Sequence, residues 1–200
     1  NLCKASERMI ATENINADAI SENELIEWSK KDHRYFEPIY EKYYEPIFRL
    51  IMYRVQDEEV TKDITSNVFC KALVNLDKYK FQGLSFSSWL YRLALNSCYD
   101  YFRTQKKKRT VVLEEFMTQE MAEEFEPETL YLQRGLKLLP EVLDKLKPRD
   151  LELIELRFFE SKSFKEISEI LGITENNAKT RSHRILKRIR KKLEPSRYEI

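Results

Sequence analysis

The sequence is poor in several residue types, and each shortage excludes a class of fold or a kind of site. Three glycines and six prolines in 200 residues, with few alternating apolar and polar runs, argue for an all-helical protein. The three cysteines are far apart and form no C-x-x-C pair, so neither a disulfide framework nor a zinc site is indicated. No apolar run approaches the roughly 20 residues that cross a bilayer. Nothing resembles a signal peptide, and we therefore expect a reduced, cytoplasmic protein without membrane insertion.

Recognisable catalytic arrangements are also missing from the sequence. Only two histidines occur, His33 in a polar turn and His183 among basic residues. No G-x-S-x-G, H-E-x-x-H, P-loop or G-x-G-x-x-G motif is found. Paired acids such as Glu58 and Glu59 are more simply solvated helix faces than general acid and base. We expect no enzyme activity, no catalytic residues, no cofactor and no metal.

The formal net charge of +1 hides two oppositely charged segments. Residues 110–146 hold nine acids and three bases, whereas residues 176–193 hold eight bases and no acid. Such segregation suggests an acidic connecting segment and a basic surface that could face nucleic acid.

Apolar residues at helical spacing predict a first domain over residues 21–109, after a flexible N-terminus at residues 1–20. Ser21 and Glu24 form the pattern of a capping box, and the next apolar residues, Leu25, Ile26 and Trp28, should pack inward. A helix over residues 35–55 should be kinked or divided at Pro46. Asp57 should cap a further helix, which ends near Leu76.

An acidic linker over residues 110–127 should lead to a second helical domain at residues 128–200. After a helix over residues 129–146, Pro148 should open the next one at its first turn. Ser163 should cap a short helix that Gly172 ends, and Thr174 should cap the last helix. The fold expected is thus two small all-α domains joined by the acidic linker.

The predicted helix over residues 85–109 carries two different stripes. The apolar stripe comprises Phe86, Leu90, Leu93, Ser97 and Tyr101. The other mixes aromatic rings, an amide and guanidinium groups, and comprises Ser85, Trp89, Arg92, Asn96, Tyr99 and Arg103. Rings that stack on bases, beside charges that follow a phosphate backbone, suit single-stranded nucleic acid. Half-buried core and a solvated helix end would explain any one residue alone, but their joint placement favours nucleic acid.

Residues 163–193 have the pattern of a helix-turn-helix, whose second helix can enter a major groove. Ala178, Ile185 and Ile189 share the inward face of that helix. Candidates for reading bases or contacting phosphates are Asn177, Lys179, Thr180, Arg181, Arg184 and Arg188. The alternative is a basic amphipathic helix that binds an acidic protein or a membrane surface, which would not need the preceding helix and glycine turn.

Two stretches together resemble the extracytoplasmic-function group of sigma-70-type sigma factors. Residues 36–103, with F-x-x-W-L-Y-R at Phe86 to Arg92, are similar to conserved region 2. Residues 146–193, with L-G-I-T and K-T-R-S-H-R, are similar to region 4. The resemblance implies a transcription-initiation subunit that binds core RNA polymerase and directs it to promoters with −10 and −35 elements. It also implies an anti-sigma factor as a possible partner.

The resemblance further implies roles for individual residues. The helix over residues 57–76 would bind the coiled coil of the largest polymerase subunit through Asp63, Asn67 and Lys71, and region 4 would contact the flap. The loop at residues 77–86 would hold a flipped base of the −10 strand. The −10 contacts would be Lys80, Phe81, Ser85, Trp89, Arg92, Asn96, Tyr99 and Arg103. The helix over residues 174–193 would read the −35 element.

Two other functions remain open on the sequence. A stand-alone helix-turn-helix regulator would bind duplex DNA without polymerase, usually as a dimer over two half-sites. This function leaves two features unexplained, the stripe of polar and aromatic residues that includes Trp89 and the acidic linker. A protein-interaction adaptor would use the charged helices for protein partners alone, and replacing Arg181 and Arg184 would then remove no DNA function.

Overall fold

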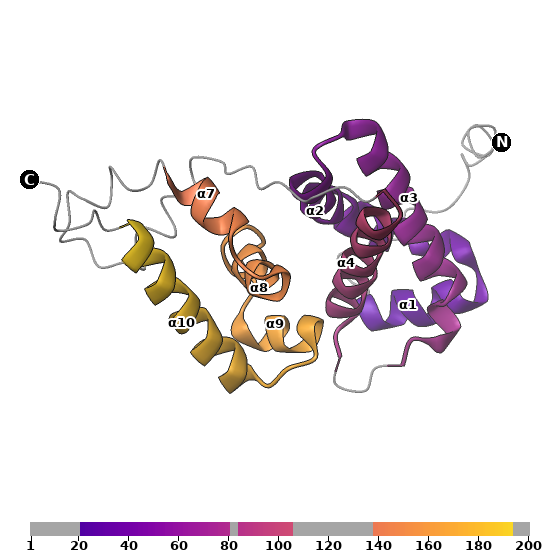
Figure 1. Ribbon diagram of the computed structural model, residues 1–200. Coiled ribbons are helices and arrows are strands. Elements are labelled where there is room, and N and C mark those ends of the chain that lie inside the picture. The colour runs from indigo at the N-terminus through magenta and orange to yellow at the C-terminus, as the bar shows by residue number, and fades with distance from the viewer. Residues whose placement is uncertain (1–20, 81–83, 106–137, 194–200) are drawn as a thin grey trace, which may run out of the picture. The chain divides into compact units, whose positions relative to one another are not determined.

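The computed structural model describes residues 21–80, 84–105 and 138–193, and every regular element in these ranges is a helix (Figure 1). The predicted all-α fold is confirmed for these residues. The flexible N-terminus and the acidic linker that we expected lie outside them. Backbone contacts divide the chain into two units, residues 1–42 and residues 43–200. The predicted domain boundaries at residues 21, 109 and 128 stay a prediction.

The first unit contains α1 (Glu22–Lys31) and the 3-10 helix η3 (His33–Phe36). The capping box predicted for Ser21 and Glu24 is present, with each side chain hydrogen-bonded to the other residue's backbone N–H. Leu25 and Ile26 are buried as expected. The inward packing predicted for Trp28 is wrong, since Trp28 is 37% exposed and its ring lies edge-on to Tyr35.

Helix α2 (Glu37–Val55) runs through Pro46 as one helix, and it starts two residues later than predicted because η3 precedes it. Helix α3 (Glu58–Val74) begins where we expected, since the Asp57 carboxylate accepts a hydrogen bond from the Val60 N–H at 3.0 Å. The short 3-10 helix η4 (Leu76–Lys78) follows.

Helix α4 (Phe86–Gln105) packs against α3 along its apolar side. Its fully buried residues include Phe86, Leu90 and Ala94, and α3 in turn buries Val68 and Ala72. Of the predicted apolar stripe, Phe86, Leu90 and Ser97 are buried, whereas Leu93 and Tyr101 are half-buried. The basic residues 106–109 that we assigned to the same helix lie outside the described part of the chain.

Within the described residues 138–193, the second unit contains the four helices α7 (Leu139–Asp144), α8 (Pro148–Phe158), α9 (Phe164–Leu171) and α10 (Glu175–Leu193). Pro148 opens α8 as predicted, and Ser163 caps α9 through a capping box with Glu166. Thr174 accepts a hydrogen bond from the Asn177 N–H, which confirms it as the cap of α10. The inward face of α10 carries buried Ala178, Ile185 and Ile189, as predicted.

Gly172 ends α9 in the left-handed conformation, with φ 67°, and sets the turn between α9 and α10. A Cβ at this position would meet no atom closer than the Arg92 guanidinium at 3.8 Å, so backbone conformation and not space is the constraint.

We therefore expect Gly172→Ala to lower the free energy of unfolding by about 1 kcal/mol, because an L-residue with a Cβ is strained in this conformation. Gly172→Asn should cost less, since asparagine tolerates it better. Urea denaturation of both variants checks this. An equal loss for Ala and Asn would contradict the backbone explanation.

Candidate nucleic-acid interface

The beginning of α4 is fixed by a local cap and by a cluster of rings. The Ser85 hydroxyl accepts a hydrogen bond from the Ser88 N–H at 3.1 Å, which makes Ser85 the cap of α4. Tyr79, Phe86 and Trp89 lie with ring centroids 5.3–5.4 Å apart. The Tyr79 hydroxyl also donates to the Leu84 carbonyl at 3.0 Å. This ring cluster holds the two ends of the segment at residues 80–84 together.

The residues predicted to contact a −10 strand have different environments. Lys80 and Asn96 are exposed, and Arg103 is exposed with an ion pair to Asp100 at 2.9 Å. Trp89 is half-buried in the ring cluster. Phe81 lies outside the described residues. The remaining three predicted contacts, Ser85, Arg92 and Tyr99, all make hydrogen bonds to α8 or α9.

Helix α9 covers the first turns of α4, and these two helices are in contact. The Glu169 carboxylate accepts hydrogen bonds from the Ser88 hydroxyl at 2.8 Å and from the Ser85 N–H at 3.3 Å. The Arg92 guanidinium donates to the backbone carbonyls of Glu169 and Ile170 near the end of α9. A carboxylate thus lies at the N-terminal end of α4, and a cation lies at the C-terminal end of α9, which suits both helix dipoles.

Helix α8 contacts the same part of the chain through buried charges. Arg54 of α2 is 3% exposed and pairs with Glu155 at 2.5 Å and with Glu152 at 3.6 Å. The Tyr99 hydroxyl donates to the Glu152 carboxylate. Both carboxylates are almost completely buried, so each depends on these partners for the hydration it has lost.

Glu160, which follows α8, is a third buried carboxylate at this contact. It accepts a hydrogen bond from the Tyr91 hydroxyl at 2.7 Å, while Arg49 lies 3.8 Å away. Burial raises the pKa of Glu160 above its ordinary 4.5, and the hydrogen bond from Tyr91 only partly opposes this. Burial and the neighbouring Glu160 charge also raise the pKa of Tyr91.

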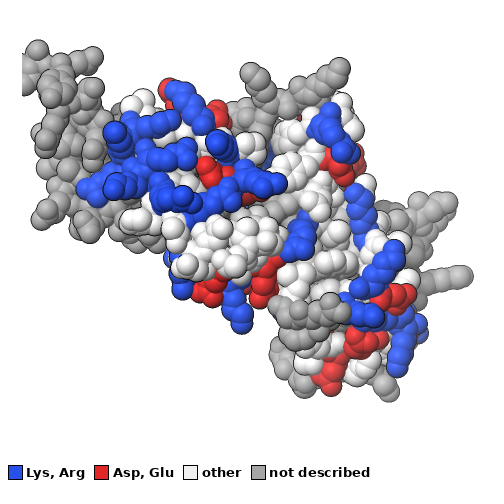
Figure 2. All heavy atoms as spheres, turned by 60° about the horizontal axis from the view of Figure 1, so that its bottom comes forward, with Lys and Arg blue, Asp and Glu red and all other residues white. Residues whose placement is uncertain are grey.

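The predicted −35 residues lie on α10, where Lys and Arg side chains gather on one face (Figure 2). Asn177, Thr180 and Arg184 are exposed, and Lys179 is exposed with an ion pair to Glu175 at 2.8 Å. The other two, Arg181 and Arg188, pair with the Asp150 carboxylate of α8 at 2.7 and 3.3 Å. Asp150 of α8 therefore ties α10 to α8 through Arg181 and Arg188.

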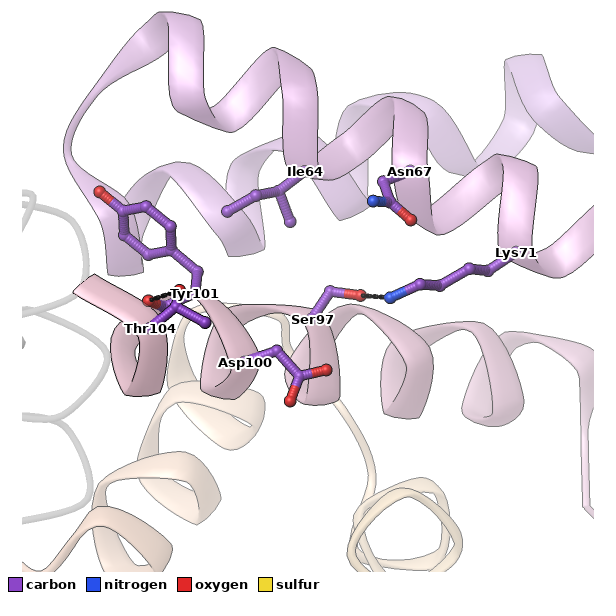
Figure 3. A pocket seen from close by; sticks show the side chains of 7 residues that line it. All are labelled: Ile64, Asn67, Lys71, Ser97, Asp100, Tyr101 and Thr104. Atoms are coloured by element: carbon purple, nitrogen blue, oxygen red, sulfur yellow. Dashed lines mark hydrogen bonds between the residues drawn. The ribbon is translucent and has the colours of Figure 1, made fainter. Parts of the chain in front are cut away.

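The residues predicted to bind polymerase lie on α3, beside a shallow groove between α3 and α4 (Figure 3). Asp63, Asn67 and Lys71 are all exposed. The Lys71 ammonium donates to the Ser97 hydroxyl at 3.4 Å. The groove has a volume of about 220 Å³, and its lining consists of Ile64, Asn67, Lys71, Ser97, Asp100, Tyr101 and Thr104. The structure thus brings Asn67 and Lys71 together at one polar edge.

The family models match the two helical parts of the chain separately. Residues 39–108 match Sigma-70 region 2, and residues 131–189 match Sigma-70 region 4. RNA polymerase sigma factor YlaC of Bacillus subtilis is 31% identical over 167 residues, which cover 82% of this chain and 94% of YlaC. This chain belongs to the sigma-70 family, in its extracytoplasmic-function group.

Other relatives agree with this membership. ECF RNA polymerase sigma factor SigW of Bacillus subtilis is 30% identical over 82% of this sigma factor and 91% of SigW. ECF RNA polymerase sigma factor BldN of Streptomyces coelicolor is 26% identical, and the match spans 58% of BldN. CnrH, solved in complex with the cytosolic domain of CnrY, has a similar fold with a TM-score of 0.56 at 19% identity, over 84% of this chain and 92% of CnrH.

Several residues of this interface were missed by sequence reasoning. In the sequence these residues look like ordinary charged positions on amphipathic helices. They are Arg54, Asp150, Glu152, Glu155, Glu160 and Glu169. Asp150, two positions after Pro148, offered at most the signal of an acid in a first helical turn.

In the described ranges no cluster of His, Cys, Asp and Glu could hold a metal ion. Among the described helices, none combines the length and apolar character that a membrane crossing requires.

The raised pKa of Glu160 predicts a pH dependence of stability. Between pH 4.5 and the raised value, the folded chain holds a proton that the unfolded chain releases. The stability from this group is therefore complete below pH 4.5 and is lost as the pH rises through the raised pKa. Glu160→Gln should flatten this decrease in urea denaturation measured from about pH 4 to pH 8. Glu45→Gln, at an exposed position, is the control, and equal profiles for both variants would contradict the assignment.

Proposed function

We propose that this sigma factor binds core RNA polymerase in the cytoplasm, captures the melted −10 strand on α4 and reads the −35 element with α10. It supplies no catalytic group of its own. Membership of the sigma-70 family supports initiation at promoters in general, and the residue assignments rest on the contacts and exposure described above.

The observation that carries the −10 assignment is the ring cluster at the beginning of α4. Tyr79, Phe86 and Trp89 fix the described residues on either side of residues 81–83, the stretch that we assign to a flipped base. Asn96 is exposed two turns further along the same helix, where its amide can hydrogen-bond a base edge. Stacking of a base on a ring contributes about 1–3 kcal/mol, comparable with the cost of flipping the base.

The exposed face of α3 suits a protein partner. Asp63, Asn67 and Lys71 lie one turn apart on α3 and leave both signs of charge and an amide open to solvent. We assign them to the coiled coil of the largest polymerase subunit, and we assign a flap contact to region 4. An anti-sigma factor would regulate the protein by covering such faces.

Region 4 presents a surface suited to duplex DNA. Asn177, Thr180 and Arg184 are exposed near the N-terminal half of α10, which is the part of a recognition helix that reaches base edges. Arg181 and Arg188 remain candidates for phosphate contact, although Asp150 already holds both guanidinium groups.

Asn96→Ala tests the −10 assignment. A lost amide contact to a base should reduce open-complex formation about tenfold, because such contacts are worth about 1–3 kcal/mol. Permanganate footprinting with core polymerase, on a promoter found by sequencing run-off transcripts of a genomic library, measures the melted strand. Gln105→Ala, at an exposed position on the same helix, should have no effect. If the Asn96→Ala variant binds polymerase and melts promoter DNA normally, Asn96 does not contact the −10 element.

Arg184→Ala tests the −35 assignment. We expect weaker recruitment to duplex promoter DNA and a salt dependence whose logarithmic slope is smaller by about one. Fluorescence anisotropy of the holoenzyme on promoter DNA, over a range of salt concentrations, measures both. Arg34→Ala removes the same charge from η3 and should leave the slope unchanged. If the salt slope of Arg184→Ala equals that of the wild type, Arg184 does not contact a phosphate.

A further inference from the structure

Two of the proposed −35 contacts, Arg181 and Arg188, are bound to one carboxylate within region 4. Asp150 of α8 pairs with both guanidinium groups. We propose that Asp150 is the positioning residue of a phosphate clamp, formed by Asp150, Arg181 and Arg188, in which it holds the two arginines so that they contact the backbone of duplex DNA beside the −35 bases. This inference rests on the proposed −35 function of α10.

The first step of the argument is the geometry of the clamp. The Arg181 Nε donates to Asp150 Oδ1 at 2.8 Å, and the Arg181 Nη2 lies 2.7 Å from the same oxygen. The Arg188 Nη1 donates to the other oxygen, Oδ2, at 3.3 Å. Two turns of α10 separate the arginines, about 10 Å along the helix, so both side chains lean toward the carboxylate that they share. Asp150 thus fixes two long side chains at one place.

The second step is the charge of the clamp. Within the described residues, one carboxylate pairs with two guanidinium groups, so the three side chains together keep one positive charge. A guanidinium has five N–H donors, and the bonds to Asp150 use only some of them. The Arg181 side chain is 21% exposed and the Arg188 side chain is 52% exposed, whereas Asp150 is buried. The clamp therefore presents a net cation with planar donors to solvent, which suits a phosphate.

The third step is the position of the clamp on α10. Asn177 and Arg184, which we assign to base edges, lie on the exposed face of this helix. At 3.6 residues per turn, Arg181 and Arg188 lie between that face and the buried face that carries Ile185. When the exposed face of a recognition helix points into a major groove, the flanks of the helix lie next to the phosphates. The clamp therefore lies where α10 would meet the DNA backbone.

Stability alone does not account for a carboxylate at this place. Helices α8 and α10 are in contact, and each buries apolar side chains, among them Leu151 and Ile154 of α8 and Ile189 of α10. A buried carboxylate loses its hydration, and pairing only offsets this cost, so apolar residues of similar volume often hold two helices equally well. What Asp150 adds is a fixed orientation of two cations. Fixed arginines favour the one register in which the base contacts also form, and this makes binding selective.

Asp150→Asn tests the clamp, because asparagine keeps the size of the side chain, removes its charge and leaves one acceptor oxygen. Fluorescence anisotropy of the holoenzyme measures binding to two duplexes, a promoter found by run-off transcription and the same promoter with a scrambled −35 element. The ratio of the two dissociation constants is the −35 selectivity. We expect it to fall about fivefold, because a released arginine binds phosphates of the scrambled duplex, with a logarithmic salt slope steeper by about one.

Three comparisons separate positioning from a structural role. With Arg181→Ala and Arg188→Ala already in place, Asp150→Asn should have no further effect on selectivity, because the side chains through which it acts are gone. Glu141→Gln removes the same charge at an exposed position of α7 and should alter neither selectivity nor salt slope. Asp150→Glu keeps the charge and should keep the wild-type salt slope, but it should lower selectivity because the longer side chain moves both guanidinium groups.

Asp150→Glu also carries the test if Asp150→Asn shows no cooperative unfolding in urea. The inference is overturned if the wild type distinguishes the two duplexes and every folded Asp150 variant does so equally well. It is also overturned if Asp150→Asn lowers selectivity as much without the two arginines as with them. If the wild type binds both duplexes equally, the proposed −35 function fails and the clamp fails with it. A loss of selectivity that requires both arginines supports the clamp and the −35 function together.

Discussion

The buried pairing of Arg54 with Glu152 and Glu155 is the interaction on which the arrangement of the second unit depends. It joins α2 to α8, and the neighbouring contacts of Tyr91 with Glu160 and of Ser88 with Glu169 extend it along α4. The contact is rich in charge, so its stability depends on complete pairing more than on apolar area. The pairing therefore holds α2 and α8 together in the described part of the chain only while all three charged side chains keep their partners.

Local structure was predictable because its causes lie within a few residues. Ser21, Asp57, Ser163 and Thr174 cap their helices as expected, since a side-chain oxygen three residues before an unpaired N–H makes the bond. Gly172 follows from the need for a left-handed residue at a helix end. The failure at Trp28 has a different origin, because helical spacing shows which side chains share a face and not how much of a large ring the neighbours cover.

The long-range part of the candidate site could not be predicted from the sequence in the same way. Glu155 and Arg54 are far apart in the chain, and an acid on an amphipathic helix normally faces water. The mixed polar and aromatic stripe on α4 is predicted to face nucleic acid, but nothing in its spacing indicates that Arg92 and Tyr99 bond to α9 and α8. Likewise, Arg181 resembled a free base-reading residue until its pairing with Asp150 was seen.

The contact between α2 and α8 is tested most directly by the distance between α3 and α10 in the free sigma factor. Cys70 is exposed on α3, and a spin label there can be paired with one at Lys187→Cys on α10, while Cys98 is buried and Cys3 is replaced by serine. Pulsed electron paramagnetic resonance should give a single short distance in the free chain. A broad distribution of long distances would contradict the account, in which the Arg54–Glu155 pair joins α2 to α8 in the free chain.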